Sequence, residues 1–236
     1  MTHSALILAA LVPAAVLLQL VYRLDRIEKE PPGILWKLLA AGALGAVLAA
    51  LGELLGLRLL ARWRTGQAAL RLAVQSFLLV ALLEEGVKYA LVRLLAWKDP
   101  AFNYRFDAVV YCVFTALGFA AVENLLYVAL YGFSAALSRA LLSVPGHCFF
   151  AVYMGLCLAE AKQAACVGEG FQMDAQLRWS LFVPVLLHGF WDFCLGMRTL
   201  WARLLFYGFV LIFFASAVFS LRSAAENDER LPRTEE

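Results

Sequence analysis

Stretches of about 20 apolar residues recur along the whole chain, and this spacing constrains the fold more than any other feature. A helix that crosses the hydrocarbon core of a bilayer needs about 20 predominantly apolar residues. About seven such stretches can be counted, at roughly 4–22, 34–60, 70–96, 108–131, 138–161, 178–197 and 201–221. The pattern predicts an all-α fold, a polytopic transmembrane helical bundle of about seven spans.

Composition agrees with a membrane protein. Of the 236 residues, 63% are hydrophobic and 16% are charged, whereas a soluble domain is nearer to about half apolar and about a quarter charged. The net charge of +2 is too small to indicate a nucleic-acid partner. One domain accounts for the length. We therefore expect a single transmembrane domain over residues 1–221, and a charged, disordered tail over residues 222–236.

The distribution of basic residues predicts the orientation of the chain in the lipid bilayer. Lys and Arg are somewhat more frequent in the first, third and fifth connections and in the tail than in the connections on the other side. Because basic residues near span ends favour the cytoplasm, the N-terminus is expected outside and the C-terminus in the cytoplasm. The first apolar run is long and follows no basic segment, so we expect a retained span rather than a cleaved signal peptide.

Four of the predicted spans carry ionisable or amide side chains. A charge inside a membrane costs on the order of 3 kcal/mol even on insertion scales, so such groups tend to be paired, neutralised or functional. In chain order the groups are Glu84, Glu85 and Lys88, then Glu123 and Asn124, then His147, then His188 and Asp192.

Helix geometry suggests that these groups meet. Residues four apart share a helix face, which places Glu84 beside Lys88 and His188 beside Asp192. Successive spans run antiparallel, and at about 1.5 Å per residue Glu84 falls near mid-membrane, while the groups of the other three spans fall in the half of the membrane that holds the N-terminus. Each could be structural alone, as an intrahelical ion pair, a packed histidine or an interhelical amide contact. Matched depth on four spans favours one shared functional site.

Two flanking features bear on this site. Pro145 and Gly146 come directly before His147, where the proline is expected to start or kink a helix. Glu53 is a further acid within the second span, and its neighbour Arg58 favours a structural or interfacial role. Gly52 and Gly56, four residues apart, indicate close helix packing.

Carboxylates and imidazoles in a secluded pocket suit hydrolysis. A buried glutamate can take a proton from water, and a histidine can hold that water while a second histidine stabilises the oxyanion. Glu84 and Glu85 are equal candidates for the base. Alternatively, a metal such as zinc lowers the pKa of its bound water. The candidate ligands are Glu85, His147, His188 and Asp192.

Five sequence elements, in this order, carry a resemblance to a known family. They are Glu84-Glu85-x-x-Lys88, Asp107-Ala-Val-Val-Tyr111, Gly118-Phe-Ala-Ala-Val-Glu123-Asn124-x-x-Tyr127, Pro145-Gly146-His147 and His188-Gly-x-x-Asp192. Together with the charged segment after the first span, this set resembles the PrsW family of intramembrane proteases. That family belongs to the superfamily of CAAX-processing proteases and bacteriocin-processing enzymes.

The resemblance implies a protease of the bacterial inner membrane. Some members of the family cleave a single-span, membrane-bound anti-sigma factor on its extracytoplasmic side. The functional positions of the family correspond here to Glu84, Glu85, Glu123, His147 and His188, with Asp192 beside the last. Lys88 would neutralise one glutamate, and Asn124 would complete the polar layer with Glu123. The resemblance leaves open whether water is activated by glutamate and histidine or by a metal.

Two other classes of function also fit a polar layer inside a membrane. Acid and histidine chains make proton relays in transporters, although the sequence shows no repeated halves with broken spans of the kind that marks many of them. A non-catalytic scaffold could use the same layer to bind a partner helix.

Overall fold

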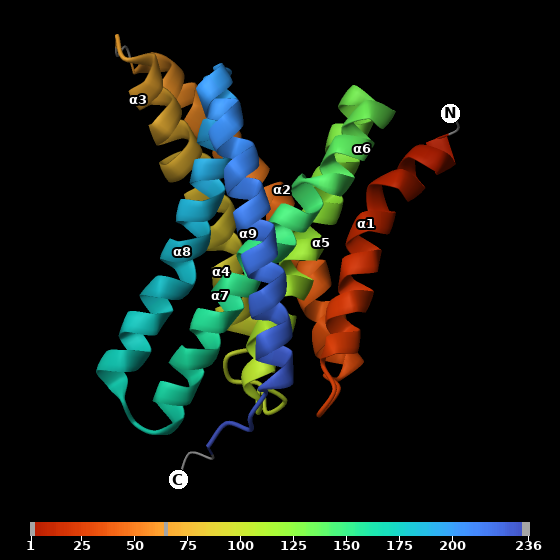
Figure 1. Ribbon diagram of the computed structural model, residues 1–236, viewed down its shortest axis with the longest axis vertical. Coiled ribbons are helices and arrows are strands. Elements are labelled where there is room, and N and C mark those ends of the chain that lie inside the picture. Colours follow the sequence, from red (N-terminus) through yellow and green to blue (C-terminus); the bar gives the residue numbers. More distant parts are fainter. Residues whose placement is uncertain (1–2, 64–65, 233–236) are drawn as a thin grey trace.

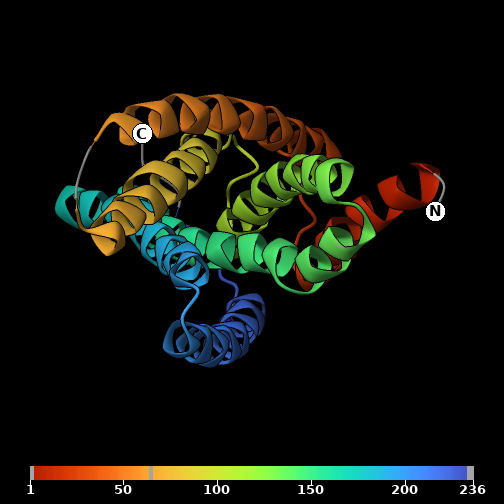
Figure 2. The ribbon, with the colours of Figure 1, turned by 90° about the horizontal axis from the view of Figure 1, so that it is seen from above.

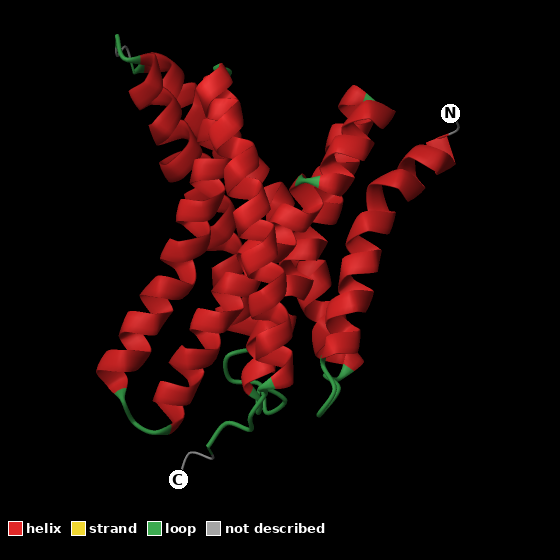
Figure 3. Cartoon of the chain, in the orientation of Figure 1, coloured by secondary structure: helices red, strands yellow, loops and turns green. Residues whose placement is uncertain are grey.

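The computed structural model describes residues 3–63 and 66–232, and within these ranges the chain is helical without β-strands (Figure 3). The helices are α1 (His3–Leu24), α2 (Pro32–Arg62), α3 (Ala68–Ala73), α4 (Leu82–Leu95), α5 (Arg105–Tyr131), α6 (Phe133–Leu141), α7 (Ser143–Cys166), α8 (Gly170–Met197) and α9 (Leu200–Glu226). A π-helical segment, η1 (Val74–Ala81), joins α3 to α4. The predicted fold class is confirmed.

Within the described ranges, six helical segments are long and apolar enough to cross a membrane, the fourth of them comprising α7 and the end of α6. The predicted third span is a further rod, in which α3, η1 and α4 follow one another without a break from Ala68 to Leu95. This rod carries Glu84, Glu85 and Lys88, and its π-helical turn lies just before them. Such wide turns inside helices occur frequently at functional sites.

Helix α5 forms the centre of the bundle. Every residue from Phe106 to Ala120 is buried, and α5 packs against α7, α2 and α1. Small residues make these close approaches possible. A Cβ atom added to Gly118 would lie 2.1 Å from the carbonyl oxygen of Leu39, and one added to Gly42 would lie 1.9 Å from that of Thr115.

The outer faces of the bundle are apolar and exposed, as lipid contact requires. Large hydrophobic side chains protrude from α2 and α9, among them Leu44, Leu48, Leu211, Ile212 and Phe219. The chain is therefore a multi-pass membrane protein. Viewed from above, α2 closes one side of the bundle, while α9 packs on the opposite side against α7 and α8 (Figure 2).

The two termini lie at opposite ends of the bundle (Figure 1). The ends of α2, α5 and α8 lie at the same end as the N-terminus, which we call the N-terminal face. The connections at Asp25–Pro31 and at Asp99–Tyr104 lie at the other end, which we call the C-terminal face.

The segment after residue 221 differs from the predicted disordered tail. Helix α9 continues to Glu226. The backbone N–H of Leu231 then donates to the carbonyl oxygen of Asn103 at 2.8 Å, and the N–H of Arg105 donates to that of Glu229 at 3.0 Å. The prediction is therefore wrong for residues 222–232, because backbone pairing and the buried Leu231 side chain hold them on the bundle. Residues 233–236 lie outside the described ranges.

Candidate active site

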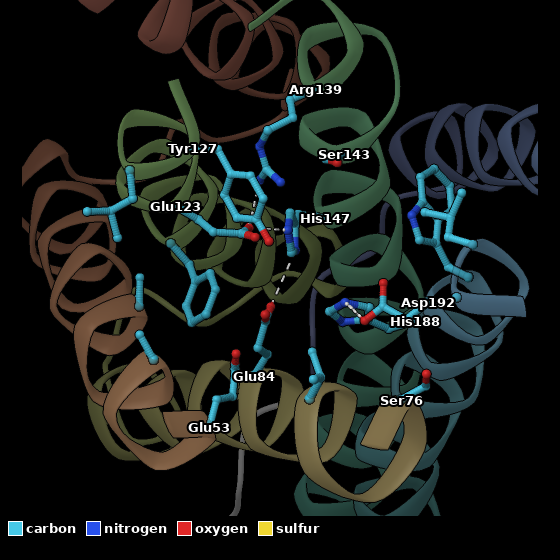
Figure 4. A pocket seen from close by; sticks show the side chains of 18 of the residues that line it. Glu53, Ser76, Glu84, Glu123, Tyr127, Arg139, Ser143, His147, His188 and Asp192 are labelled. Carbon is cyan, nitrogen blue, oxygen red and sulfur yellow. Dashed lines mark hydrogen bonds and ion pairs between the residues drawn. The ribbon is translucent and has the colours of Figure 1, made fainter. Parts of the chain in front are cut away.

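A cavity of about 650 Å³ lies among the helices α2 to α8 and the segment η1. Its apolar walls reach Leu57, Leu72, Tyr131 and Gly196, close to the N-terminal face. Its polar lining is shown in Figure 4 and includes Glu53, Glu84, Glu123, Arg139, His147, His188 and Asp192. The predicted polar residues thus share one cavity or lie directly behind it.

Helix α4 supplies a charged triad at the floor of the cavity. Lys88 Nζ lies 3.2 Å from Glu84 Oε2 and 2.8 Å from Glu85 Oε1. All three side chains are buried. The spacing of four residues predicted the first contact, and the spacing of three allows the second. Glu84 lines the cavity, whereas Glu85 and Lys88 lie behind its surface.

His147 joins this triad from α7. Lys88 Nζ lies 3.0 Å from His147 Nδ1. Because an ammonium group has no acceptor, it donates to Nδ1, so Nε2 carries the proton. Nε2 in turn lies 2.8 Å from Glu123 Oε2 of α5 and donates to it. Pro145 stands in the first turn of α7, which begins at Ser143, so the predicted helix start is confirmed.

His188 of α8 lies against the other glutamate. Its Nδ1 is 2.8 Å from Glu85 Oε1, and its Nε2 is 3.6 Å from Asp192 Oδ2. Both ring nitrogens therefore face carboxylate oxygens. The ring stacks on Phe150 at a centroid distance of 5.0 Å and meets the His147 ring edge-on at 5.5 Å. These ring contacts restrict how the two imidazoles can turn.

Two residues that line the cavity have positions that the sequence did not indicate. Arg139 of α6 is 9% exposed and contacts Glu123 and Asn124. The sequence did not single it out, because it lies at the very start of the predicted span 138–161, where a basic residue commonly only sets orientation. Glu53 lines the cavity, which the interpretation based on Arg58 did not predict.

The motif around Asp107 and Tyr111 lies away from the cavity. Asp107 accepts hydrogen bonds from the backbone N–H groups of Asn103 and Tyr104 at 2.9 and 2.7 Å, which caps α5 at the C-terminal face. The Tyr111 hydroxyl donates to Glu30 in the first connection. This element thus positions helices and contributes nothing to the cavity lining.

Four buried side chains form a candidate metal-binding group. Glu84, Glu85, His147 and His188 each offer one ligand atom, and these atoms lie within 4.8 Å of one another. Carboxylate oxygens and imidazole nitrogens are ligands that zinc prefers, so the types of ligand in this group fit a zinc ion. Asp192 does not belong to it, and Glu84 takes the place expected for Asp192. However, the Lys88 ammonium lies within 3.2 Å of donor atoms of three of the four residues.

That ammonium already occupies the place of a cation. A divalent ion held by the same donors would stand beside it, and two positive charges so close repel strongly in a buried site. With Lys88 in this position the residues do not fit a metal, and the chemistry below is derived from the side chains alone.

The fold and the cavity together define a class of protein: a multi-pass helical bundle with paired glutamates and histidines meeting inside the membrane. Comparison with known proteins gives the family. The model of the PrsW family of intramembrane metalloproteases matches residues 30–219. The chain belongs to the PrsW family and is an intramembrane protease, so its substrates are membrane proteins cleaved within the bilayer.

Named relatives agree with this assignment. A protein named Protease PrsW from Clostridioides difficile is 32% identical over 211 residues, which is 88% of this chain and 86% of the relative. One of the same name from Geobacillus kaustophilus is 32% identical over 84% of this chain and 82% of its own length. The Protease PrsW of Bacillus subtilis is 37% identical over 53% of this chain and 56% of its own. No solved structure matches the chain.

Proposed function

We propose that this protease hydrolyses a peptide bond with a water molecule activated by Glu84. Three helices bring Glu84, Glu85, His147 and His188 within 4.8 Å of one another at a cavity inside the membrane, and this observation carries the proposal. Of the two glutamates, Glu84 is the better base because its carboxylate lines the cavity. Glu85 is held between Lys88 and His188 behind the cavity surface.

In the proposed reaction, Glu84 takes a proton from water as the water oxygen attacks the scissile carbonyl carbon. His147 lies beside this position, with Nδ1 4.0 Å from Glu84 Oε2, and helps to hold the water. His188, oriented by Glu85 and Asp192, donates from Nε2 to the developing oxyanion. The C–N bond then breaks, and the proton on Glu84 passes to the leaving amine. Lys88 offsets the charge of the glutamates throughout.

The proposed substrate is a single-span membrane protein, for example an anti-sigma factor cut on its extracytoplasmic side. The cavity approaches the N-terminal face, and the basic residues favour the outside for that face. We place the protein in the bacterial inner membrane, with the C-terminus in the cytoplasm.

Purified protein mixed with a tagged single-span substrate tests the chemistry. Glu84→Gln keeps the size of the side chain and removes the base, so cleavage should fall by about 10²–10⁴-fold while thermal unfolding in detergent stays unchanged. Glu169→Gln, in the exposed connection before α8, is the matched control and should cleave normally. Full activity of the Glu84 variant would overturn the assignment of the base.

The same assay addresses the other two classes of function. A transporter would move a solute across proteoliposomes in a way sensitive to uncouplers, without cutting the substrate. A scaffold would bind the substrate and leave it intact.

A further inference from the structure

Arg139 is the buried cation of a short helix whose large apolar side chains face outward. The large apolar residues of α6, Phe133, Leu137 and Leu141, are each about half exposed or more, whereas Arg139 is only 9% exposed. Its side chain extends over Tyr127 toward Glu123 and His147 (Figure 4). A guanidinium group buried at this depth requires paired partners.

Arg139 has three partners, all on α5. One terminal nitrogen of its guanidinium, NH2, lies 2.8 Å from Glu123 Oε2. Its Nε donates to Asn124 Oδ1 at 3.0 Å. Its guanidinium carbon lies 4.2 Å from the centre of the Tyr127 ring. Asn124 in turn donates to the backbone carbonyl of Ala10 at 2.7 Å, which fixes the amide from the other side. The contacts define the position of the guanidinium group.

The contact with Glu123 links Arg139 to the histidine. Glu123 Oε2 receives both the Arg139 guanidinium and His147 Nε2, each at 2.8 Å. A carboxylate fixed in this way keeps the proton of His147 on Nε2. His147 Nδ1 then keeps its lone pair toward Lys88 and Glu84. Second partners of this kind commonly set the tautomer and the orientation of a functional histidine.

We propose that Arg139 is a positioning residue of the proteolytic site and acts through Glu123 on His147. The proposal rests on the function proposed above. It assigns to α6 the task of closing a chain of contacts that runs from Arg139 through Glu123 and His147 to Lys88. Arg139 itself does not touch the reacting atoms.

A double-mutant cycle tests the route. Arg139→Met and Glu123→Gln should each lower kcat by about 10–100-fold with little change in KM. The double variant should be no slower than the slower single variant, because both changes interrupt one chain. Arg139→Lys should regain at least part of the lost kcat, since its charge can still reach Glu123. Arg203→Met, on the exposed face of α9, is the matched control and should cleave normally.

A second measurement does not depend on activity. The chain has three histidines, so nitrogen NMR of a His3→Gln background reports only His147 and His188. His147 should carry its proton on Nε2, and Arg139→Met should produce a mixture of tautomers.

The inference fails if Arg139→Met keeps its kcat, if losses multiply in the double variant, or if the tautomer of His147 does not change. In all three cases an inactive Glu84→Gln would leave the proposed function standing. An active Glu84→Gln would instead remove the proposed function while leaving the tautomer measurement interpretable.

Discussion

Lys88 is a buried ammonium inside a membrane-spanning bundle, and its surroundings explain how it is tolerated. It contacts Glu84, Glu85 and His147, and it lies 4.2 Å from the centre of the Phe119 ring. Removing one partner of a buried ion pair leaves an uncompensated charge, which costs far more than the pair itself contributes.

We therefore expect Lys88→Met to be among the most destabilising single changes in the protein. Two adjacent buried carboxylates would lose their shared cation, with an expected cost of about 3–5 kcal/mol. Thermal unfolding in detergent measures the effect. Lys98→Met, on the exposed connection after α4, should unfold like the native protein. Equal unfolding temperatures of both variants would contradict this account of the charge balance.

The position of Lys88 also predicts the metal content. Because the ammonium contacts three of the four donor side chains, we expect purified protein to contain no stoichiometric zinc and to keep cleaving in a strong chelator. Elemental analysis and the cleavage assay measure the two properties on one sample. Zinc bound at one ion per chain, and lost together with activity, would show that Lys88 moves aside.

At the scale of elements, the contact between α2 and α5 depends on the absence of side chains. A Cβ at Gly118 would meet the backbone of Leu39, which cannot move as a flexible side chain can. Gly118→Leu should therefore lower the unfolding free energy by about 1–3 kcal/mol or more. Gly208→Leu is the matched control, because nothing lies within 4 Å of a Cβ there. Equal stability of both variants in detergent unfolding would argue against this contact.

The connection between α1 and α2 contains an acid whose environment predicts a pH dependence. Burial raises the pKa of the Glu30 carboxyl above its ordinary value of 4.5, although hydrogen bonds with Asp107 and Tyr111 act in the opposite direction. The folded protein thus binds this proton more tightly than the unfolded chain, so stability falls as the pH rises from about 4.5 through the folded pKa.

Glu30→Gln removes that dependence while keeping an oxygen that can accept from Tyr111. We expect the variant to be at least as stable as the native protein at neutral pH, and its unfolding temperature to change less between mildly acidic and neutral pH. Glu169→Gln, in the exposed connection before α8, should keep the native pH dependence. A steeper fall of the unfolding temperature with rising pH in the Glu30→Gln variant would contradict this prediction.

Local pattern predicted the elements and many of their polar contacts, because both depend on short sequence separations. Apolar length gave the spans, and spacings of four residues gave Glu84 with Lys88 and His188 with Asp192. The contact of Lys88 with His147 joins residues 59 positions apart, and no local pattern contains it. The sequence also did not predict that α5 lies at the centre of the bundle. The spans are predominantly apolar around their whole circumference, so periodicity cannot show which one the others enclose.

On the scale of the whole molecule, the orientation in the membrane remains a prediction that labelling can test. In a background without the five native cysteines, Gly66→Cys lies at the N-terminal face and Glu169→Cys at the C-terminal face. We expect an impermeant maleimide to label the first in intact cells and the second only after permeabilisation. The reverse pattern would place the cavity mouth in the cytoplasm and exclude an extracytoplasmic substrate cut.

The depth of the cavity has a consequence for what can be cut. Glu123 lies eight residues before the end of α5, about 12 Å along the helix axis, so a scissile bond cut at the proposed site must descend into the bilayer. A transmembrane substrate enters as a helix, in which the backbone carbonyl groups already accept hydrogen bonds from the same segment. Those hydrogen bonds must break before water can attack. Segments whose helix unwinds easily, with glycine or proline beside the scissile bond, should be cleaved fastest. The enzyme would then select its substrates by how easily their helices unwind more than by the identity of their side chains.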